Sequence, residues 1–179
     1  EINISTVLSE ESSIICDNNS LYAAVQDAGA GADTAFARID ITGGRTTQCN
    51  HNTVDTQSTG GTNVCQSWLV IEGAGSLSGS GSIMGNTLIA STAVGAGARA
   101  QIEATDFGDV TIVGNSLFNS GTAGFTRIAV DAAAAGDVRN AVVHSNIVKG
   151  TNFIVVNNAT IGRFGGAADV GVTQHNIVN

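Results

Sequence analysis

The chain has 179 residues, of which 42% are hydrophobic and 12% charged, and 15 acidic against 7 basic residues give a formal net charge of −8. This length favours one domain, the hydrophobic content argues against disorder, and the negative charge argues against a nucleic-acid partner. No apolar stretch reaches the roughly 20 residues that span a bilayer as a helix, so no membrane span is expected. Aromatic residues make up only 4% and proline is absent, which favours a core of small aliphatic side chains in stacked β-strands.

The first residues are expected to form a strand and a cap. Apolar residues that alternate with polar ones predict a strand over residues 1–8, and the polar residues 9–13 then form a linker. Asn19 or Ser20 provides a helix cap ahead of an apolar face, so a short helix is predicted over residues 21–28. Such a helix would cover the open end of a stack of strands, whose unpaired edges need protection.

The rest of the chain is expected to be a β-solenoid. Two aliphatic segments, residues 38–41 and 68–72, each have a glycine within the next two residues and are interpreted as strands of the first coils. The polar stretch between them is interpreted as an inserted loop over residues 46–66. We therefore assign residues 1–37 to the N-terminal strand and capping helix, and residues 38–179 to the solenoid.

The chain contains three cysteines. Cys49 and Cys65 flank the polar stretch 50–63, and a disulfide that closes this loop would stabilise the fold by about 3 kcal/mol. The alternative is a pair of unbonded thiols in a reduced protein. Cys16 is then left over, and it is either buried, paired instead with Cys49, or bridged to another subunit.

A repeat of about 30 residues is the strongest pattern in the sequence. Asparagines recur at nearly equal intervals, at positions Asn86, Asn115, Asn146 and Asn176. Short aliphatic strands recur with them and cannot bury a face alone, whereas stacked coils bury a continuous core. The pattern predicts an all-β chain, a right-handed parallel β-helix of about five to six coils. Asparagine at a corner tolerates left-handed backbone, and its amide can bond to the asparagine of the next coil, so an asparagine ladder is expected. The alternative is that asparagine only marks the turns.

One segment of the chain resembles a known group of proteins. Cys16, the run Ser20–Val25 and the run Ile39–Gly44 look like the lead-in segment of secreted bacterial parallel β-helix proteins with a pectin-lyase-like fold, where a Cys-Ser-Leu-Arg-Glu-Ala-Ile motif precedes an Ile-rich strand. The resemblance implies a secreted or cell-surface solenoid and does not imply lyase activity. Glu1 stands where an initiator methionine would, which is interpreted as a mature chain after removal of a signal peptide, although a recombinant fragment would begin in the same way.

Acidic residues recur in the repeat and raise the question of a metal site. Asp109, Asp137 and Asp169 follow one another at intervals close to that of the repeat, so they are expected to stack along one edge of the solenoid. Adjacent carboxylates repel one another, and calcium would relieve the repulsion. The alternative is that each aspartate accepts backbone N–H bonds at the start of a strand. Calcium is the only cofactor that the sequence suggests.

The sequence also offers a pair of carboxylates for polysaccharide cleavage. Glu103 and Asp131 are separated by the same interval as Asp109 and Asp137, so they are expected at matched positions of neighbouring coils, with Asn157 continuing that row. Glycoside hydrolysis uses two carboxylates about 5 to 10 Å apart. The chain nevertheless lacks the clusters of acidic, histidine and basic residues that sugar-cleaving β-helix enzymes carry. We therefore expect that the chain is not an enzyme.

The expected function is structural: a subunit of an extracellular filament or a surface or biofilm matrix, made of copies of this chain joined head to tail. Open solenoid ends present unpaired strand edges, and contacts of this kind give open filaments. The first strand could alternatively be exchanged between subunits. The expected assembly residues lie near the two ends: Ile2, Ile4, Val7, Leu8, Val172 and Ile177. The alternatives are an adhesive module that binds cell-surface glycans through one sheet face and, third, a polysaccharide lyase or hydrolase.

Overall fold

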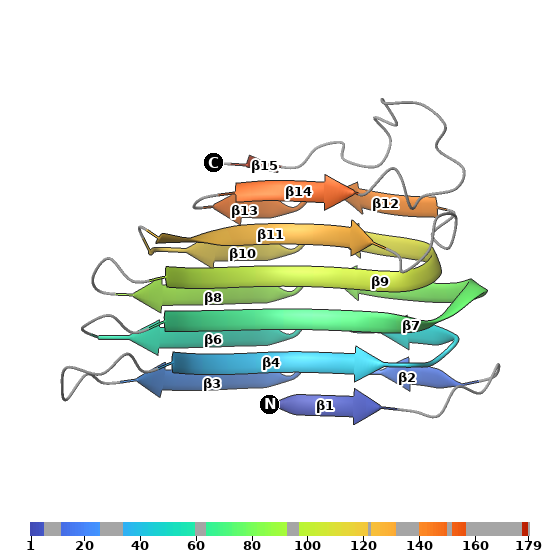
Figure 1. Cartoon of the computed structure of the whole chain (residues 1–179), viewed down its shortest axis with the longest axis horizontal. Coiled ribbons are helices and arrows are strands. Elements are labelled where there is room, and N and C mark those ends of the chain that lie inside the picture. Colours follow the sequence, from blue (N-terminus) through green and yellow to red (C-terminus); the bar gives the residue numbers. More distant parts are fainter. Residues whose placement is uncertain are drawn as a thin grey trace.

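The computed structural model describes residues 1–5, 12–25, 34–59, 64–92, 97–121, 123–131, 140–149, 152–156 and 177–178. Every regular element in these residues is a β-strand, and every strand pair is parallel. Figure 1 shows the strands stacked one above another, with the N-terminus at the bottom and the C-terminus at the top. The expected fold class, an all-β parallel solenoid, is confirmed.

The front face is a sheet of long strands. Its order is β1, β4, β7, β9, β11 and β14, and these strands span Ile2–Ser5, Thr34–Thr42, Val64–Met84, Gly97–Val113, Ala123–Asp131 and Asn152–Val156. Residues of the strands alternate between the interior and the outer surface, as the pleat requires.

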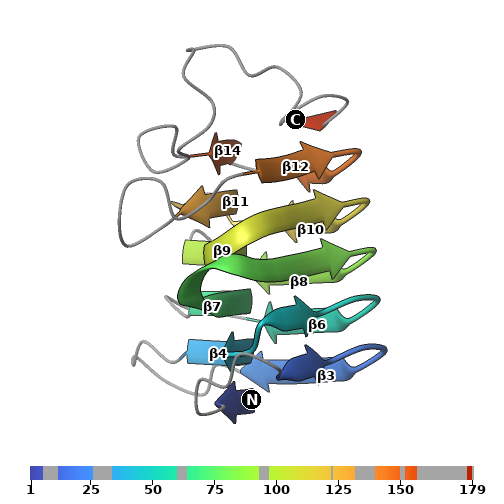
Figure 2. The ribbon, with the colours of Figure 1, turned by 90° about the vertical axis from the view of Figure 1, so that its right-hand side faces the viewer.

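The second face consists of short strands and the ends of two long ones. It contains β2, β5 and β12, which span Ser13–Ile15, Thr46–Gln48 and Asn140–His144. Strand β2 pairs with β5, β5 pairs with the end of β7, and β12 pairs with the end of β9. Strands β7 and β9 therefore pass round a corner from the front face to this one, and their bend is clear in Figure 2. Phe107 is fully buried near this corner, and a Cβ at Gly81 would lie only 2.9 Å from its ring.

The third face is a separate six-stranded sheet. Its order is β15, β13, β10, β8, β6 and β3, and these strands span Ile177–Val178, Ile147–Lys149, Ser116–Asn119, Thr87–Thr92, Thr53–Ser58 and Ser20–Val25. In Figure 1 its strands β6 and β8 lie behind the front sheet. The three faces thus enclose one interior.

The core is built from columns of like side chains in register. On the front face Ile39, Leu69, Ile102 and Ile128 lie directly above one another, and each is 0% exposed. The third face supplies a matching column of Val54, Leu88, Leu117 and Val148, which are also fully buried. Each coil therefore completes the burial of its neighbours, as the short aliphatic strands of the sequence predicted.

The predicted helix is wrong. Residues 20–25 form β3, which pairs with β6 from Ser20↔Thr53 to Val25↔Ser58. Leu21, Ala23 and Val25 alternate toward the core, and this period of two prevails over the weaker helical pattern because β6 offers a strand to pair with. The residues 26–28 of the expected helix lie outside the described part. The expected number of coils stays a prediction, since residues 132–139 and 157–176 also lie outside it.

The N-terminal third is part of the same stack. Strands β1, β2 and β3 pair with β4, β5 and β6, and the expected boundary between residues 37 and 38 falls inside β4. Residues 46–66 are likewise not an inserted loop: they contain β5, β6 and the start of β7. Polar residues fill this stretch because many of its side chains face outward or join the interior hydrogen bonds described next.

Candidate functional site

A ladder of five asparagines runs through the interior at the corner before the third face. It consists of Asn19, Asn52, Asn86, Asn115 and Asn146. At each step the backbone N–H and the side-chain Nδ2 of the lower asparagine donate to Oδ1 of the one above, over 2.8 to 3.0 Å. Every bond between two ladder asparagines has its donor in the lower coil and its acceptor in the upper one, so the ladder has a direction.

The amides of the ladder also reach the coil below. Nδ2 of Asn52 donates to the carbonyl of Cys16 at 2.8 Å, and Nδ2 of Asn146 donates to the carbonyl of Ile112 at 3.0 Å. Asn86 and Asn115 make the equivalent bonds to their own lower coils. Because these four amides are almost fully buried, the bonds offset the cost of removing polar groups from water.

Left-handed backbone positions the ladder. The residue before each ladder asparagine has a positive φ between 56° and 69°, namely Asn18, His51, Gly85, Gly114 and Ser145. Glycine adopts this region without strain, and asparagine, histidine and serine are short or polar enough to tolerate it at a single position. The sharp turn aims the next side chain into the interior.

The sequence located part of this ladder. Asn86, Asn115 and Asn146 are the three members named from the repeat, and Asn176 lies outside the described residues. Asn19 and Asn52 were missed, because the first coils are longer, with spacings of 33 and 34 residues. The signal was nevertheless present: in both, as in Asn86 and Asn115, the asparagine is followed by Ser or Thr and then an aliphatic residue.

The lower end of the stack differs from its middle. Among the described residues, β1, β2 and β3 each have one partner strand, which lies above them. Apolar side chains on this end pack against the core and are only partly buried: Ile2, Ile4, Leu21, Ala23 and Val25. Directly above them, Ile39, Ile41 and Val54 are 0% exposed. We call these five partly buried residues the lower apolar face.

Two of the expected assembly residues belong to this face. Ile2 and Ile4 lie on β1 with their side chains toward the core. Ile177 lies at the other end, where its backbone pairs with Ile147. Val7, Leu8 and Val172 lie outside the described residues.

Aromatic and arginine side chains gather on the outer surface of the front sheet. The ring of Phe36 meets that of Trp68 edge to face, with 5.4 Å between centroids, and the guanidinium of Arg38 lies 5.6 Å from the centre of the Trp68 ring. Higher on the same face, Arg99 and Arg127 lie 5.3 and 5.8 Å from the ring of Phe125. Such contacts are attractive because a cation faces the negative side of the ring.

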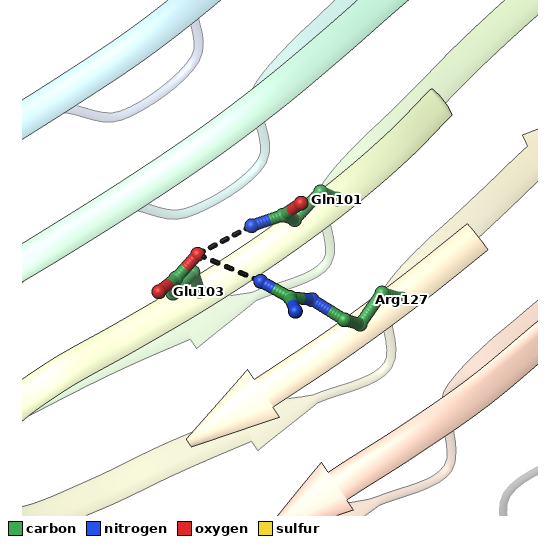
Figure 3. Close-up of polar contacts among 3 residues, drawn as sticks. All are labelled: Gln101, Glu103 and Arg127. Carbon is green, nitrogen blue, oxygen red and sulfur yellow. Dashed lines mark hydrogen bonds and ion pairs between the residues drawn. The ribbon is translucent and has the colours of Figure 1, made fainter. Parts of the chain in front are cut away.

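Glu103 lies on β9, the strand between β7 and β11 of the same sheet. It accepts hydrogen bonds from Gln101 of its own strand and from Arg127 of the strand above, the latter at 3.1 Å (Figure 3). Its expected match with Asp131 is wrong: Glu103 is in register with Ala129, and Asp131 is in register with Thr105. The pairing of β9 with β11 is thus shifted by two positions from the expected one, so the two carboxylates belong to different columns.

The expected row of stacked aspartates is wrong for its first pair. Asp109 lies in register with Ser80 below and Asn140 above, so its column does not continue to Asp137. Asp137 and Asp169 themselves lie outside the described residues. Within the ranges described above, no group of three or more His, Cys, Asp or Glu side chains is placed to hold a metal ion.

The expected disulfide between Cys49 and Cys65 is not formed, and all three thiols are free. Cys65 lies on the front sheet between Ala35 and Ala98, whereas Cys49 lies on the second face above Cys16. The sequence separation was misleading because residues 53–58, between the two cysteines, form β6 of the third face. The alternative of unbonded thiols therefore describes the structure.

The thiols have different acidities. A hydrogen bond with Cys49 lowers the pKa of Cys16 to about 7, against the opposing effects of burial and of Asp17. The same bond, together with burial, raises the pKa of Cys49. Burial raises the pKa of Cys65, whose Sγ contacts the carbonyl of Ser91 at 3.2 Å.

No protein-family model matches the chain, and neither a curated protein nor a solved structure matches it. Among the described residues, no helix has the length and apolar character needed to cross a membrane.

Proposed function

We propose that the chain is a structural subunit of an extracellular filament, surface layer or biofilm matrix, and that its copies stack head to tail. The observation that carries the proposal is the lower apolar face, where the aliphatic core is only partly covered. Strands with one free side are templates for another strand, and apolar surface favours association. The extracellular setting rests on the resemblance of residues 16–44 to secreted β-helix proteins.

One column of the front sheet has an aliphatic residue on both the lowest and the highest strand that the structure describes. The front column that begins at Ile2 passes through Ile39 and Ile128 and reaches Ile154 on β14. If β14 of one copy lay beneath β1 of the next, an aliphatic position would again meet an aliphatic position. Because this contact joins two different surfaces, it repeats without closing and gives an open filament.

The ladder adds a polar component to the same contact. The Oδ1 atoms of Asn52, Asn86, Asn115 and Asn146 each accept two N–H groups from the coil below. Among the described residues, no donor reaches Oδ1 of Asn19 at the lower end. A copy stacked beneath would bring donors to this atom, which would orient the subunits in one direction. Exchange of β1 is the second route, but β1 already pairs with β4 of its own chain, so stacking needs no rearrangement.

A charge on the lower apolar face tests this function. Ile4→Asp places a carboxylate among the partly buried aliphatic side chains, whereas Asn3→Asp places the same charge on the exposed side of the same strand. We expect wild type and Asn3→Asp to sediment as concentration-dependent assemblies and to show filaments by electron microscopy. Ile4→Asp should weaken association at least about tenfold, which corresponds to about 1.4 kcal/mol. Monomers at all micromolar concentrations for wild type would refute the proposal.

The second candidate function is glycan binding on the outer face of the front sheet. The observation that favours it is the group of aromatic and arginine side chains on this face, which contains Phe36, Trp68, Phe125 and three arginines. Aromatic rings pack against the C–H face of a sugar, and arginine donates hydrogen bonds to its hydroxyls. Trp68 is the only tryptophan, so its fluorescence reports directly on this face. Saturable quenching by an oligosaccharide that Phe36→Ala abolishes, in a protein that remains monomeric, would favour this function over the structural one.

A further inference from the structure

Two cysteines occupy the same place in successive coils. The backbone N–H of Cys16 donates to the carbonyl of Gln48 at 2.8 Å, and the N–H of Cys49 donates to the carbonyl of Ser82 at 2.9 Å. Their parallel strands β2 and β5 are in register up to the preceding residues, Ile15 and Gln48. Both side chains are buried, with 5% and 0% exposure.

The rest of this column shows that the cysteines are not required for packing. In the higher coils the same place is taken by Ile83, Ile112 and Val143, all fully buried. Among the described residues of this column, thiols replace aliphatic groups only in the two lowest coils. An aliphatic side chain would fill this interior equally well, so the pair of sulfurs calls for another explanation.

The asparagine ladder holds both sulfurs in place. Nδ2 of Asn19 lies 3.3 Å from Sγ of Cys16, and Nδ2 of Asn52 lies 3.4 Å from Sγ of Cys49. Each thiol is therefore held by the ladder amide of its own coil. Neighbouring strands are about 4.8 Å apart, and the Cα atoms of a disulfide are usually about 4.4 to 6.8 Å apart, so the backbone spacing suits a bond between the two sulfurs.

We propose that Cys16 and Cys49 are an oxidisable pair that closes to a disulfide, a modification that joins the lowest coil covalently to the coil above it. The oxidant is a peroxide, of which hydrogen peroxide is the smallest. The proposal does not depend on the function proposed above, because it concerns the single chain in either case.

The chemistry follows from the different acidities of the two thiols. The lowered pKa of Cys16 supplies a thiolate near neutral pH, and its Sγ attacks one peroxide oxygen, breaks the O–O bond and becomes a sulfenic acid. The departing hydroxide takes up the proton that Cys16 had released. Sγ of Cys49 then attacks Sγ of Cys16, and the second hydroxide leaves with the proton of Cys49. Two thiols and one hydrogen peroxide thus give one disulfide and two waters.

Peptide mapping tests the pairing directly. The folded chain is treated with one equivalent of hydrogen peroxide, its remaining thiols are alkylated, and it is digested without reduction by a protease that cleaves before aspartate. The three cysteines then fall in separate peptides, residues 1–16, 40–54 and 55–105. We expect mass spectrometry to find peptide 1–16 linked to peptide 40–54, with Cys65 alkylated.

Matched variants complete the test. Cys65→Ser retains the pair and should form the same link, whereas Cys16→Ser and Cys49→Ser should form none. The oxidised Cys65→Ser protein should also unfold at a higher urea concentration than its reduced form, and a reductant should reverse the shift. The mapping of wild type and Cys65→Ser stands even if another variant fails to fold. Recovery of alkylated Cys16 and Cys49, a link to peptide 55–105, or a link between two chains would overturn the proposal.

Discussion

The middle of the stack and its lower end are built from the same columns but are enclosed to different degrees. Ile39 in the middle is 0% exposed, while Ile2, directly below it, is only partly buried. The side chain of Asn86 both donates to the asparagine above and accepts from the asparagine below, whereas among the described residues no donor reaches Oδ1 of Asn19. The comparison teaches that in a solenoid a residue acquires its energetic weight from the coils on both of its sides.

The largest difference is expected in the ladder. Asn86→Ala leaves the buried backbone N–H of Asn52 and the carbonyl of Cys49 without partners, each costing roughly 1 to 3 kcal/mol, and it removes one bond of the Asn52 side chain, so the free energy of unfolding should fall by about 4 kcal/mol. Asn19→Ala should cost only about 1 kcal/mol, because water reaches the lower end. Urea unfolding followed by circular dichroism measures both. Equal losses would show that the ladder is not reinforced from both sides.

The aliphatic column should show the same difference on a smaller scale. Ile39→Ala opens a cavity between two coils and should cost about 3 kcal/mol, within the range for buried Ile→Ala changes. Ile2→Ala, in the same column, should cost about 1 kcal/mol in the monomer. Urea unfolding at concentrations below the onset of association gives both values. A loss for Ile2→Ala as large as that for Ile39→Ala would indicate that the lower end is already enclosed.

The regular coils could be predicted from the sequence better than the coils near the N-terminus. Where the coils have nearly equal lengths, the pattern around Asn86, Asn115 and Asn146 was enough to predict a parallel solenoid and its ladder. Near the N-terminus the coils lengthen, so Asn19 and Asn52 fell out of the repeat and a helix was predicted over residues 21–28, of which residues 21–25 are in fact a strand. Their strand conformation depends on pairing with β6, which belongs to the next coil and is distant in the sequence.

Side-chain partners were harder to predict than the repeat. A shift of two positions in the pairing of β9 with β11 removed Glu103 from the column of Asp131. Likewise, Cys49 and Cys65 are close in sequence but lie on different faces, whereas Cys16 and Cys49, which are much further apart in sequence, are stacked. Register in a solenoid is set by the length of each corner, and a small difference in that length changes every contact.

The stability of the chain should depend on pH because of Cys16, which lies in the lowest coil. The folded-state pKa of Cys16 is lowered from an ordinary value near 9 to about 7, so the folded chain holds fewer protons than the unfolded chain between these values. The free energy of unfolding should therefore rise from pH 7 to pH 9, and this contribution is lost as the pH falls through 7. The rise should be smaller than the loss expected for Asn86→Ala or for Ile39→Ala. Above pH 9 the raised pKa of Cys49 acts in the opposite direction. In a reductant, Cys65→Ser should retain the rise and Cys16→Ser should lose it.

The smallest effect is expected for a side chain halfway up the stack that faces outward from the front sheet. Glu103→Gln removes the ion pair with Arg127, in which both side chains are about 30% exposed. The free energy of unfolding should therefore fall by less than about 1 kcal/mol, and by still less at high salt. The next residue on β9, Ile102, is fully buried, so Ile102→Ala is the matched substitution in the interior. If urea unfolding gave equal losses for the two, height along the stack rather than enclosure would determine stability. A small loss for Glu103→Gln would mean that the outer face can vary in sequence at little cost, which is what a surface that adapts to a ligand requires.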